Sequence, residues 1–189
     1  MNYTKRALAI AATSLTLACS ANDTPSDDAA SLAGEERTRL AYGDFILANG
    51  ETVSGVKLVA EGTVAKLIVA ASDLPAGTRG FHLHETGSCE GPDFKSAGGH
   101  LNPLGKAHGT ESEGGSHVGD LPNLVLNESA NEPQTFTIDG SLEQVSEWIF
   151  DEDGTAVVIH AEPDDYKTDP SGAAGARIAC AVLDPDATP

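Results

Sequence analysis

Basic residues are scarce in this sequence: 11 lysines and arginines stand against 29 aspartates and glutamates, for a formal net charge of −18. Proteins that bind nucleic acids neutralise phosphates with clustered lysines and arginines. The charge balance therefore argues against a nucleic-acid partner. It leaves the fold open, because net charge governs solubility and association.

Aromatic residues are also few, at 5% of the chain, and long amphipathic helix patterns are absent. A core of valine, isoleucine, leucine and alanine is therefore expected. The chain has instead many short segments rich in β-branched residues and bounded by Gly, Pro, Asn or Asp, which are typical of strands. We expect strands near residues 39–48, 52–60, 63–71, 79–84, 116–120, 134–138, 154–160 and 176–183.

These short strands predict an all-β fold, either a sandwich or a barrel. Two long irregular stretches, residues 85–115 and 161–175, interrupt the strand pattern. Loops of this length inside a compact domain are usually functional or disordered. Both stretches are therefore candidates for functional loops.

The apolar run at residues 7–18 is too short to span a bilayer, which needs about 20 residues. Because a positively charged start precedes this run, residues 1–18 are predicted to be a signal peptide. The sequence LTLAC that ends at Cys19 resembles a bacterial lipoprotein processing site, with Cys19 as the lipidated N-terminus. Ordinary cleavage after Ser20 or Ala21 is the alternative.

Residues 19–37 are small, acidic and rich in serine and alanine, which predicts a disordered tether ahead of a folded domain at 38–189. The chain is expected to be exported to the periplasm or cell envelope, where its lipid alone would anchor it to the outer membrane. An exported domain tends to pair its thiols. A bond between Cys89 and Cys180 leaves Cys19 over, and lipidation would use it.

The six histidines are not scattered evenly along the chain. Side chains alternate faces along a strand, so His82 and His84 in FHLH share one face and suit one metal ion. Alone, such a pair is more often two half-exposed polar residues. The remaining histidines change that interpretation, together with one aspartate: His100, His108, His117, His160 and Asp120.

Imidazole nitrogens suit zinc and copper, and a carboxylate can complete a zinc ligand set. Six histidines and one aspartate exceed the needs of one tetrahedral site. Two adjacent metal ions are therefore a simpler interpretation than six unrelated surface or core histidines.

Five segments together resemble the copper/zinc superoxide dismutase family, particularly its exported bacterial members. They are GFHLHETGSCE, SAGGHLNPLGKAHG, HVGDLPN, VVIHAEPDDY and GAAGARIACAV, and the resemblance runs from about residue 38 to residue 184. It implies an eight-stranded Greek-key β-barrel or sandwich with two long functional loops. It also implies one copper ion and one zinc ion per subunit.

The resemblance implies a role for each candidate ligand. The copper ligands would be His82, His84, His100 and His160. The zinc ligands would be His100, His108, His117 and Asp120. One ring nitrogen of His100 would then face each metal.

Further matches concern residues around the metals. Asp164 matches an aspartate that joins a copper histidine to a zinc histidine and would fix both rings, with a solvated turn residue as the alternative. Cys89 and Cys180 match an intrasubunit disulfide, against the alternative of two free thiols. Arg177 matches an arginine that stands beside the copper and attracts a small anion, with a surface arginine at a strand end, paired with an acid, as the alternative.

The implied reaction is the dismutation of superoxide to dioxygen and hydrogen peroxide, by a copper redox cycle in which zinc holds the bridging His100. Arg177 and His100 would be the catalytic residues, and the chain would be a monomer or a homodimer. The alternative is an exported copper- or zinc-binding storage protein on the same scaffold, without turnover. Arg177 argues against storage, which needs no guide for an anion.

Overall fold

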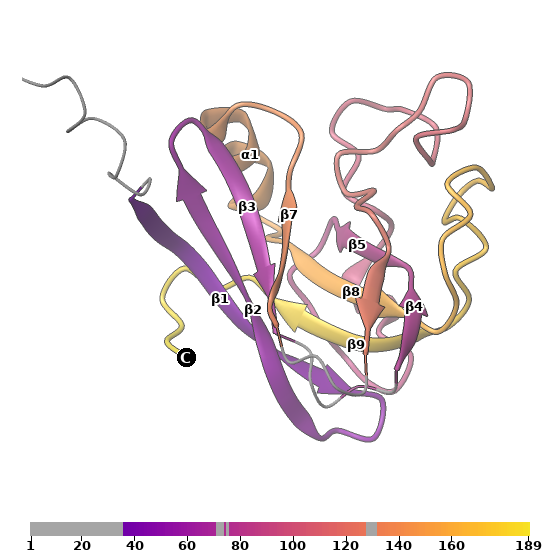
Figure 1. The fold of residues 1–189 in the computed structure, drawn as a ribbon, viewed down its shortest axis with the longest axis horizontal. Helices are drawn as coiled ribbons and strands as arrows, with labels where there is room; N and C mark the ends of the chain where they lie inside the picture. Colours follow the sequence, from indigo (N-terminus) through magenta and orange to yellow (C-terminus); the bar gives the residue numbers. More distant parts are fainter. Residues whose placement is uncertain (1–35, 71–73, 75, 128–131) are drawn as a thin grey trace, which may run out of the picture. The chain divides into compact units, whose positions relative to one another are not determined.

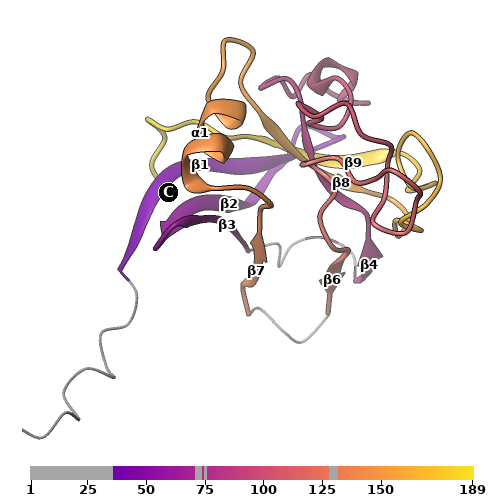
Figure 2. The ribbon, with the colours of Figure 1, turned by 90° about the horizontal axis from the view of Figure 1, so that it is seen from above.

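An antiparallel sheet forms the larger part of the structure. The computed structural model describes residues 36–70, 74, 76–127 and 132–189, and within them seven strands form a curled sheet in the order β5-β8-β9-β1-β2-β3-β7 (Figures 1 and 2). A second sheet pairs β4 with β6. The strands are β1 (Arg37–Leu47), β2 (Thr52–Glu61), β3 (Val64–Val69), β4 (Gly77–Arg79), β5 (Phe81–His84), β6 (Leu124–Leu126), β7 (Gln134–Thr137), β8 (Ala156–His160) and β9 (Arg177–Val182).

Burial alternates along the strands as the sequence pattern requires. In β3 the side chains of Ala65, Leu67 and Val69 are buried, while those between them are half-buried. The core that the strands enclose is mainly aliphatic, as expected, and it includes the fully buried rings of Phe45 and Phe81. The expectation of an all-β fold is therefore confirmed.

One expected strand is wrong: residues 116–120 are irregular, with a turn at Val118 and Gly119, and the strand in this part of the chain is β6. The Asp120 carboxylate accepts a hydrogen bond from the His117 N–H at 3.0 Å, and local bonds of this kind compete with strand pairing. The strand expected at 79–84 divides at Gly80, where the chain leaves the small sheet as β4 and joins the large one as β5.

The short helix α1 (Leu142–Ile149) is not among the expected elements. Ser141 caps it, because its side chain accepts the Gln144 N–H while the Gln144 side chain accepts the Ser141 N–H. The helix buries Val145 and Ile149 against the core. Eight residues are too few to display a helical period clearly, so only the capping residues could have indicated it.

The two expected long loops, 85–115 and 161–175, are present, and within them the structure assigns one short 3₁₀ turn, Lys95–Ala97. The predicted signal peptide and the predicted lipid site Cys19 lie outside the described residues, as does most of the predicted tether. Among the described residues, no helix has the length and apolar character needed to cross a membrane.

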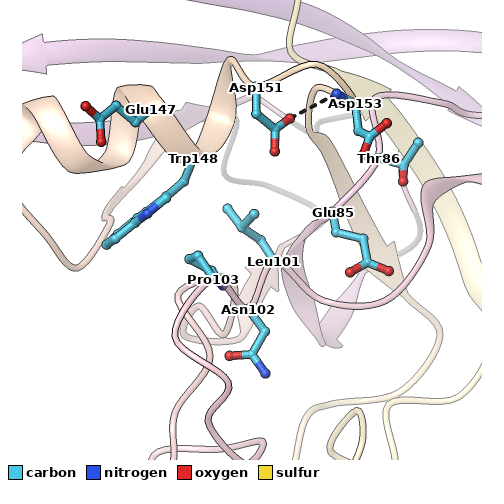
Figure 3. A pocket seen from close by; sticks show the side chains of 9 residues that line it. All are labelled: Glu85, Thr86, Leu101, Asn102, Pro103, Glu147, Trp148, Asp151 and Asp153. Carbon is cyan, nitrogen blue, oxygen red and sulfur yellow. Dashed lines mark hydrogen bonds between the residues drawn. The ribbon is translucent and has the colours of Figure 1, made fainter.

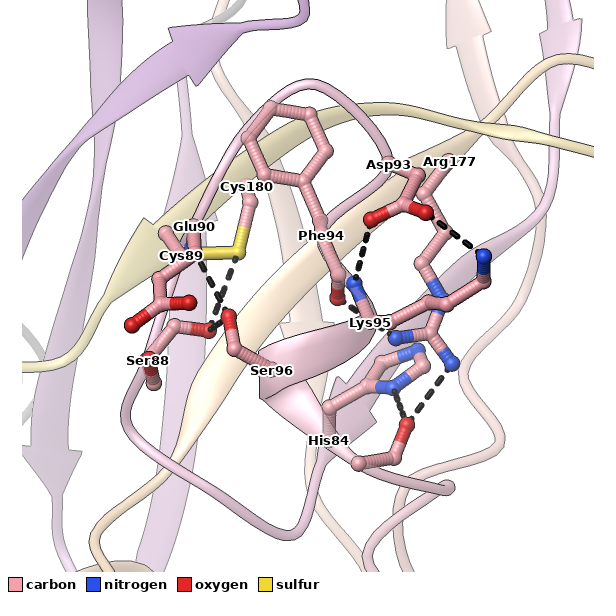
Figure 4. The surroundings of a disulfide bond; sticks show 11 residues. His84, Ser88, Cys89, Glu90, Asp93, Phe94, Lys95, Ser96, Arg177 and Cys180 are labelled. Carbon is pink, nitrogen blue, oxygen red and sulfur yellow. Dashed lines mark hydrogen bonds and ion pairs between the residues drawn. A yellow bond between two sulfur atoms is a disulfide. The ribbon is translucent and has the colours of Figure 1, made fainter.

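A disulfide bond joins Cys89 to Cys180 and ties the first long loop to β9 (Figure 4), which confirms the predicted pair. The two cysteines are 91 residues apart in the sequence. Beside the bond, Ser96 Oγ accepts the Glu90 N–H at 2.8 Å and donates to the Ser88 carbonyl at 3.1 Å. The first long loop is therefore held at its base both covalently and by hydrogen bonds.

Loss of this disulfide is expected to lower the free energy of unfolding by about 4 kcal/mol, because the unfolded chain regains the freedom of a very long loop. Urea unfolding of the metal-free protein, oxidised against reduced and alkylated, measures the difference. A Cys89→Ser/Cys180→Ser variant controls for the alkyl groups. An unchanged unfolding midpoint in both comparisons would contradict the expectation.

Candidate metal centre

Strand β5, in which all four residues are buried, contains two of the candidate histidines. Phe81 and Leu83 of this strand pack in the hydrophobic core. Because side chains alternate along a strand, His82 and His84 point to the opposite face. Both histidines are 0% exposed, so their ring nitrogens need partners other than water.

The first long loop and the segment after it return to β5 and lie along it. The Leu83 N–H donates to the Gly119 carbonyl, and the Leu101 N–H donates to the Leu83 carbonyl, both at 2.9 Å. These bonds extend the sheet pattern to residues without regular structure of their own. Two isolated antiparallel bridges result: His84 with His100, and His82 with Asp120.

The end of β8 places His160 in the same region. The register of β8 and β9 shifts between Ile159 and His160, so that His160 pairs with Arg177. Such irregularities re-aim side chains and are frequent beside functional sites. The shift therefore brings a histidine and an arginine together at one end of the sheet.

Four buried histidines form the first cluster, and their facing ring nitrogens lie within 4.8 Å of one another: His82, His84, His100 and His160. Within the described structure, one buried nitrogen in each ring has no hydrogen-bond partner: His82 Nδ1, His84 Nε2, His100 Nε2 and His160 Nε2. Unpaired nitrogens are disfavoured in a protein interior. Four imidazole nitrogens are a donor set that suits copper, so these residues fit a copper ion.

Three histidines and one aspartate form the second cluster: His100, His108, His117 and Asp120. Asp120 Oδ1 lies 2.8 Å from His100 Nδ1, 3.0 Å from His108 Nδ1 and 3.1 Å from His117 Nδ1. Ligands of a tetrahedral zinc ion, bound at 2.0–2.1 Å, are separated by about 3.3 Å. Both the donor types and their spacing therefore fit zinc.

His100 belongs to both clusters. Its Nδ1 faces Asp120 at 2.8 Å, and its buried Nε2 lies with the nitrogens of the first cluster. An imidazole that has lost its proton offers a lone pair on each nitrogen. One ring can therefore serve two metal ions.

The carboxylate of Asp164 contacts one histidine of each cluster. Its Oδ2 lies 2.7 Å from His82 Nε2 and its Oδ1 lies 3.1 Å from His108 Nε2. The side chain of Asn123 fixes the main chain of Asp164 with two hydrogen bonds. It donates to the Asp164 carbonyl at 2.9 Å and accepts the Asp164 N–H at 2.8 Å. The Tyr166 hydroxyl in turn accepts the Asn123 N–H at 2.9 Å. A carboxylate held in this way fixes the tautomer and orientation of both rings.

Two more rings of the first cluster, those of His84 and His160, are held by carbonyl groups. His84 Nδ1 lies 3.1 Å from the Gly98 oxygen, and His160 Nδ1 lies 3.3 Å from the Gly175 oxygen. In each case the protein occupies one nitrogen and leaves the other free. Among the residues that the structure describes, the second nitrogen of each of these rings is buried and has no hydrogen-bond partner.

Burial lowers the pKa of three of these rings, and nearby positive charge adds to the effect. The pKa falls to about 2 for His84, to about 4 for His100 and to about 3 for His160. These rings are neutral at pH 7. His84 and His160 can therefore bind a metal ion without releasing a proton, whereas His100 must lose its remaining proton to serve two metal ions. In the aspartates burial favours the neutral acid, but the hydrogen bonds they accept lower the pKa of Asp164 to about 2 and that of Asp120 below its usual range.

The clusters open to solvent through a metal cleft of about 510 Å³. Its lining residues are Glu85, Gly99, His100, Asn102, His117, His160, Pro170, Ser171, Gly175 and Arg177. Arg177 is half-buried, and its guanidinium donates to the Phe94 and Gly98 carbonyls at 2.7 Å each (Figure 4). Carbonyl partners orient the guanidinium and leave its positive charge in the wall of the cleft.

The structure thus brings the described candidate residues together around one centre, with Arg177 beside the first cluster and Asp164 behind both. The sequence interpretation missed Asn123 and Tyr166, although both lie inside quoted motifs, HVGDLPN and VVIHAEPDDY. It also missed Glu85, which lines the metal cleft. The motifs contain these residues, but their partners lie on other segments of the chain.

Comparison with known proteins gives one consistent result. A family model described as copper/zinc superoxide dismutase matches residues 53–183. The chain is 40% identical over 156 residues to superoxide dismutase (Cu-Zn) 1 of Aquifex aeolicus, covering 81% of this chain and 90% of that protein. It is 35% identical over 144 residues to extracellular superoxide dismutase (Cu-Zn) of Haemonchus contortus, covering 70% of this chain and 74% of that protein.

Solved structures with a similar fold include a SOD-like protein from Bacillus subtilis, with a TM-score of 0.71 and 39% identity over 77% of this chain and 99% of that chain. The Cu/Zn superoxide dismutase from Brucella abortus has a TM-score of 0.61 and 27% identity, over 79% of this chain and 100% of that chain. The curled antiparallel sheet is therefore shared with proteins of this class.

The metal-free protein is expected to lose stability as the pH falls from 7 towards 4. Below a pH of about 6.5 the unfolded chain protonates its histidines, whereas burial keeps His84, His100 and His160 neutral in the fold. The unfolded state then binds more protons, so stability decreases by about 1.4 kcal/mol per pH unit for each such ring. Urea unfolding with a chelator present, followed by Trp148 fluorescence, measures this, and constant stability between pH 7 and 5 would contradict it.

Proposed function

Because the chain belongs to the copper/zinc superoxide dismutase family, we propose that it converts two superoxide anions and two protons into dioxygen and hydrogen peroxide. The observation that supports this most directly is the shared histidine: two metal-binding clusters meet at His100, beside Arg177 and an open cleft. A stored metal ion would not need the guanidinium beside it.

In this proposal the first cluster holds copper and the second holds zinc. The buried nitrogens that have no partner among the described residues support the copper assignment, and the three nitrogens around Asp120 support the zinc assignment. When bound, copper supplies a one-electron redox couple, whereas zinc is redox-silent and contributes charge and geometry.

Arg177 draws the superoxide anion into the cleft and orients it. A guanidinium carries five N–H donors, and the two recorded bonds to carbonyl groups leave donors for the substrate. Charge-assisted bonds to an anion are stronger than neutral ones. The strongly acidic chain repels anions at long range, so this local charge carries the attraction.

His100 handles a proton at Nε2, the nitrogen that faces the first cluster. This atom takes up a proton in one half of the cycle and gives it to the reduced oxygen species in the other half. Its Nδ1 stays with the Asp120 cluster, so the ring keeps its place while Nε2 changes partner. The second proton comes from solvent through the cleft.

We also propose that the chain is exported. The relative from Haemonchus contortus is named as an extracellular enzyme, and the Cys89–Cys180 bond suits an oxidising compartment. The predicted signal peptide and a lipid on Cys19 complete this proposal. Monomer and homodimer are both compatible with it.

The metal-loaded protein is expected to consume superoxide far faster than the uncatalysed reaction. Arg177→Ala is expected to lower the rate constant by roughly tenfold or more at equal metal content, because it removes the local anion attraction. His160→Ala, which removes a proposed copper ligand, is expected to be nearly inactive. Pulse radiolysis measures all three proteins, and a copper-loaded wild type without activity would favour the storage alternative.

Separate substitutions of His100 and His108 are expected to distinguish a histidine that binds both metals from one that binds zinc alone. His100→Ala should reduce both copper and zinc content, because this ring is proposed to bind both metals. His108→Ala should mainly reduce zinc. Metal analysis after loading and exhaustive dialysis gives both contents per chain. A His100→Ala protein with full zinc content would contradict the shared ligand.

A further inference from the structure

Glu85 stands at the rim of the metal cleft, directly after His84 at the end of β5. Its side chain is exposed, and it lines both the metal cleft and a neighbouring pocket of about 380 Å³ (Figure 3). The other charged residues that line the neighbouring pocket are also acidic: Glu147, Asp151 and Asp153. Glu85 is therefore the point at which this acidic surface reaches the metal cleft.

Among the described residues that line the metal cleft, Glu85 is the only carboxylate and Arg177 is the only guanidinium. A negative charge at the entrance opposes the approach of an anion, and at short range salt screens this repulsion little. Attraction of the substrate therefore does not explain a glutamate at this position. The contacts that Glu85 makes within the protein do explain it.

One peptide group connects Glu85 to two residues of the centre. The Gly99 N–H donates to Glu85 Oε1 at 2.9 Å. The carbonyl of the same peptide group belongs to Gly98: it accepts from Arg177 Nη2 at 2.7 Å and lies 3.1 Å from His84 Nδ1. In Figure 4 the dashed lines from the His84 ring and the Arg177 guanidinium meet at one oxygen, which carries no label. A carboxylate on the N–H side polarises the peptide group and strengthens its carbonyl as an acceptor.

The backbone at Gly98 is fitted closely around the Glu85 side chain. Gly98 has a φ of 75°, which favours glycine, and a Cβ there would lie 2.8 Å from Glu85 Cγ and Oε1. The Glu85 N–H also donates to the Gly99 carbonyl at 3.0 Å. Glu85 thus holds this pair of glycines through both its side chain and its main chain.

We infer that Glu85 is a positioning residue for the proposed reaction: it fixes the peptide group between Gly98 and Gly99, and through it Arg177 and the His84 ring, while its charge weakens anion binding in the metal cleft. The inference rests on the proposed function, because it assigns the anion to Arg177 and the His84 ring to copper.

A glutamine variant isolates the charge. Glu85→Gln keeps an oxygen for the Gly99 N–H, so the metal-loaded protein is expected to bind azide roughly two- to fivefold more tightly than wild type. Azide is the probe, titrated by the change in the visible absorption of copper. Glu147→Gln is the matched control, because it makes the same chemical change in the neighbouring pocket outside the metal cleft. Its azide affinity is expected to equal that of wild type.

An alanine variant removes the charge and the hydrogen bond together. Glu85→Ala is expected to bind azide roughly threefold or more weakly than Glu85→Gln, because the peptide group between Gly98 and Gly99 loses its side-chain acceptor and keeps only the main-chain bond from residue 85. The visible absorption maximum of copper is expected to shift in the alanine variant alone, because the His84 ring loses its orientation. A glutamate with a merely structural role would weaken azide binding in both variants and would give no increase with glutamine.

Equal azide affinity in wild type and Glu85→Gln, or the same increase in Glu147→Gln, would overturn the charge effect. Equal affinities and spectra in Glu85→Gln and Glu85→Ala would overturn the positioning role. A copper-loaded wild type whose spectrum does not respond to azide would reject the proposed anion site itself. That last result is separate from any comparison between the variants, so the failure of the proposed function and the failure of the inference are distinguishable.

Discussion

The centre depends on one constraint: an imidazole has two nitrogens, and in each ring of the first cluster the fold supplies a protein partner for one of them. Carbonyl groups hold Nδ1 of His84 and His160, and Asp164 holds Nε2 of His82. Within the part of the chain that the structure describes, the remaining nitrogens are buried without a hydrogen-bond partner, and the four rings group closely enough to share one ion. A metal ion satisfies all of them at once, so metal binding and native packing stabilise each other.

The partners of the positively charged side chains indicate how a strongly acidic protein could attract an anion. Two lysines of the long loops are neutralised by neighbouring carboxylates: Lys95 by Asp93 at 2.6 Å and Lys167 by Glu111 at 3.1 Å. Arg177 bonds to carbonyl groups instead and keeps its charge. In the proposed function, Arg177 therefore supplies the positive charge that attracts the anion within the metal cleft.

Much of the centre could be predicted from sequence because it follows from local chemistry. Alternation along FHLH places His82 and His84 on one face, and the structure has this arrangement. The strand expected at 116–120 is wrong because a side chain bonds to the backbone there and local propensity does not register it. Asn123 and Glu85 could not be predicted, because each acts on a segment distant in sequence.

The central claim is that one histidine ring joins two different metal ions. The most direct test is a crystal structure of the copper- and zinc-loaded protein with anomalous data at both absorption edges. We expect a copper peak among the ligands of the first cluster and a zinc peak among those of the second, with Nε2 of His100 on copper and Nδ1 on zinc. A single peak, or a His100 ring bound to one metal alone in a fully loaded protein, would contradict it.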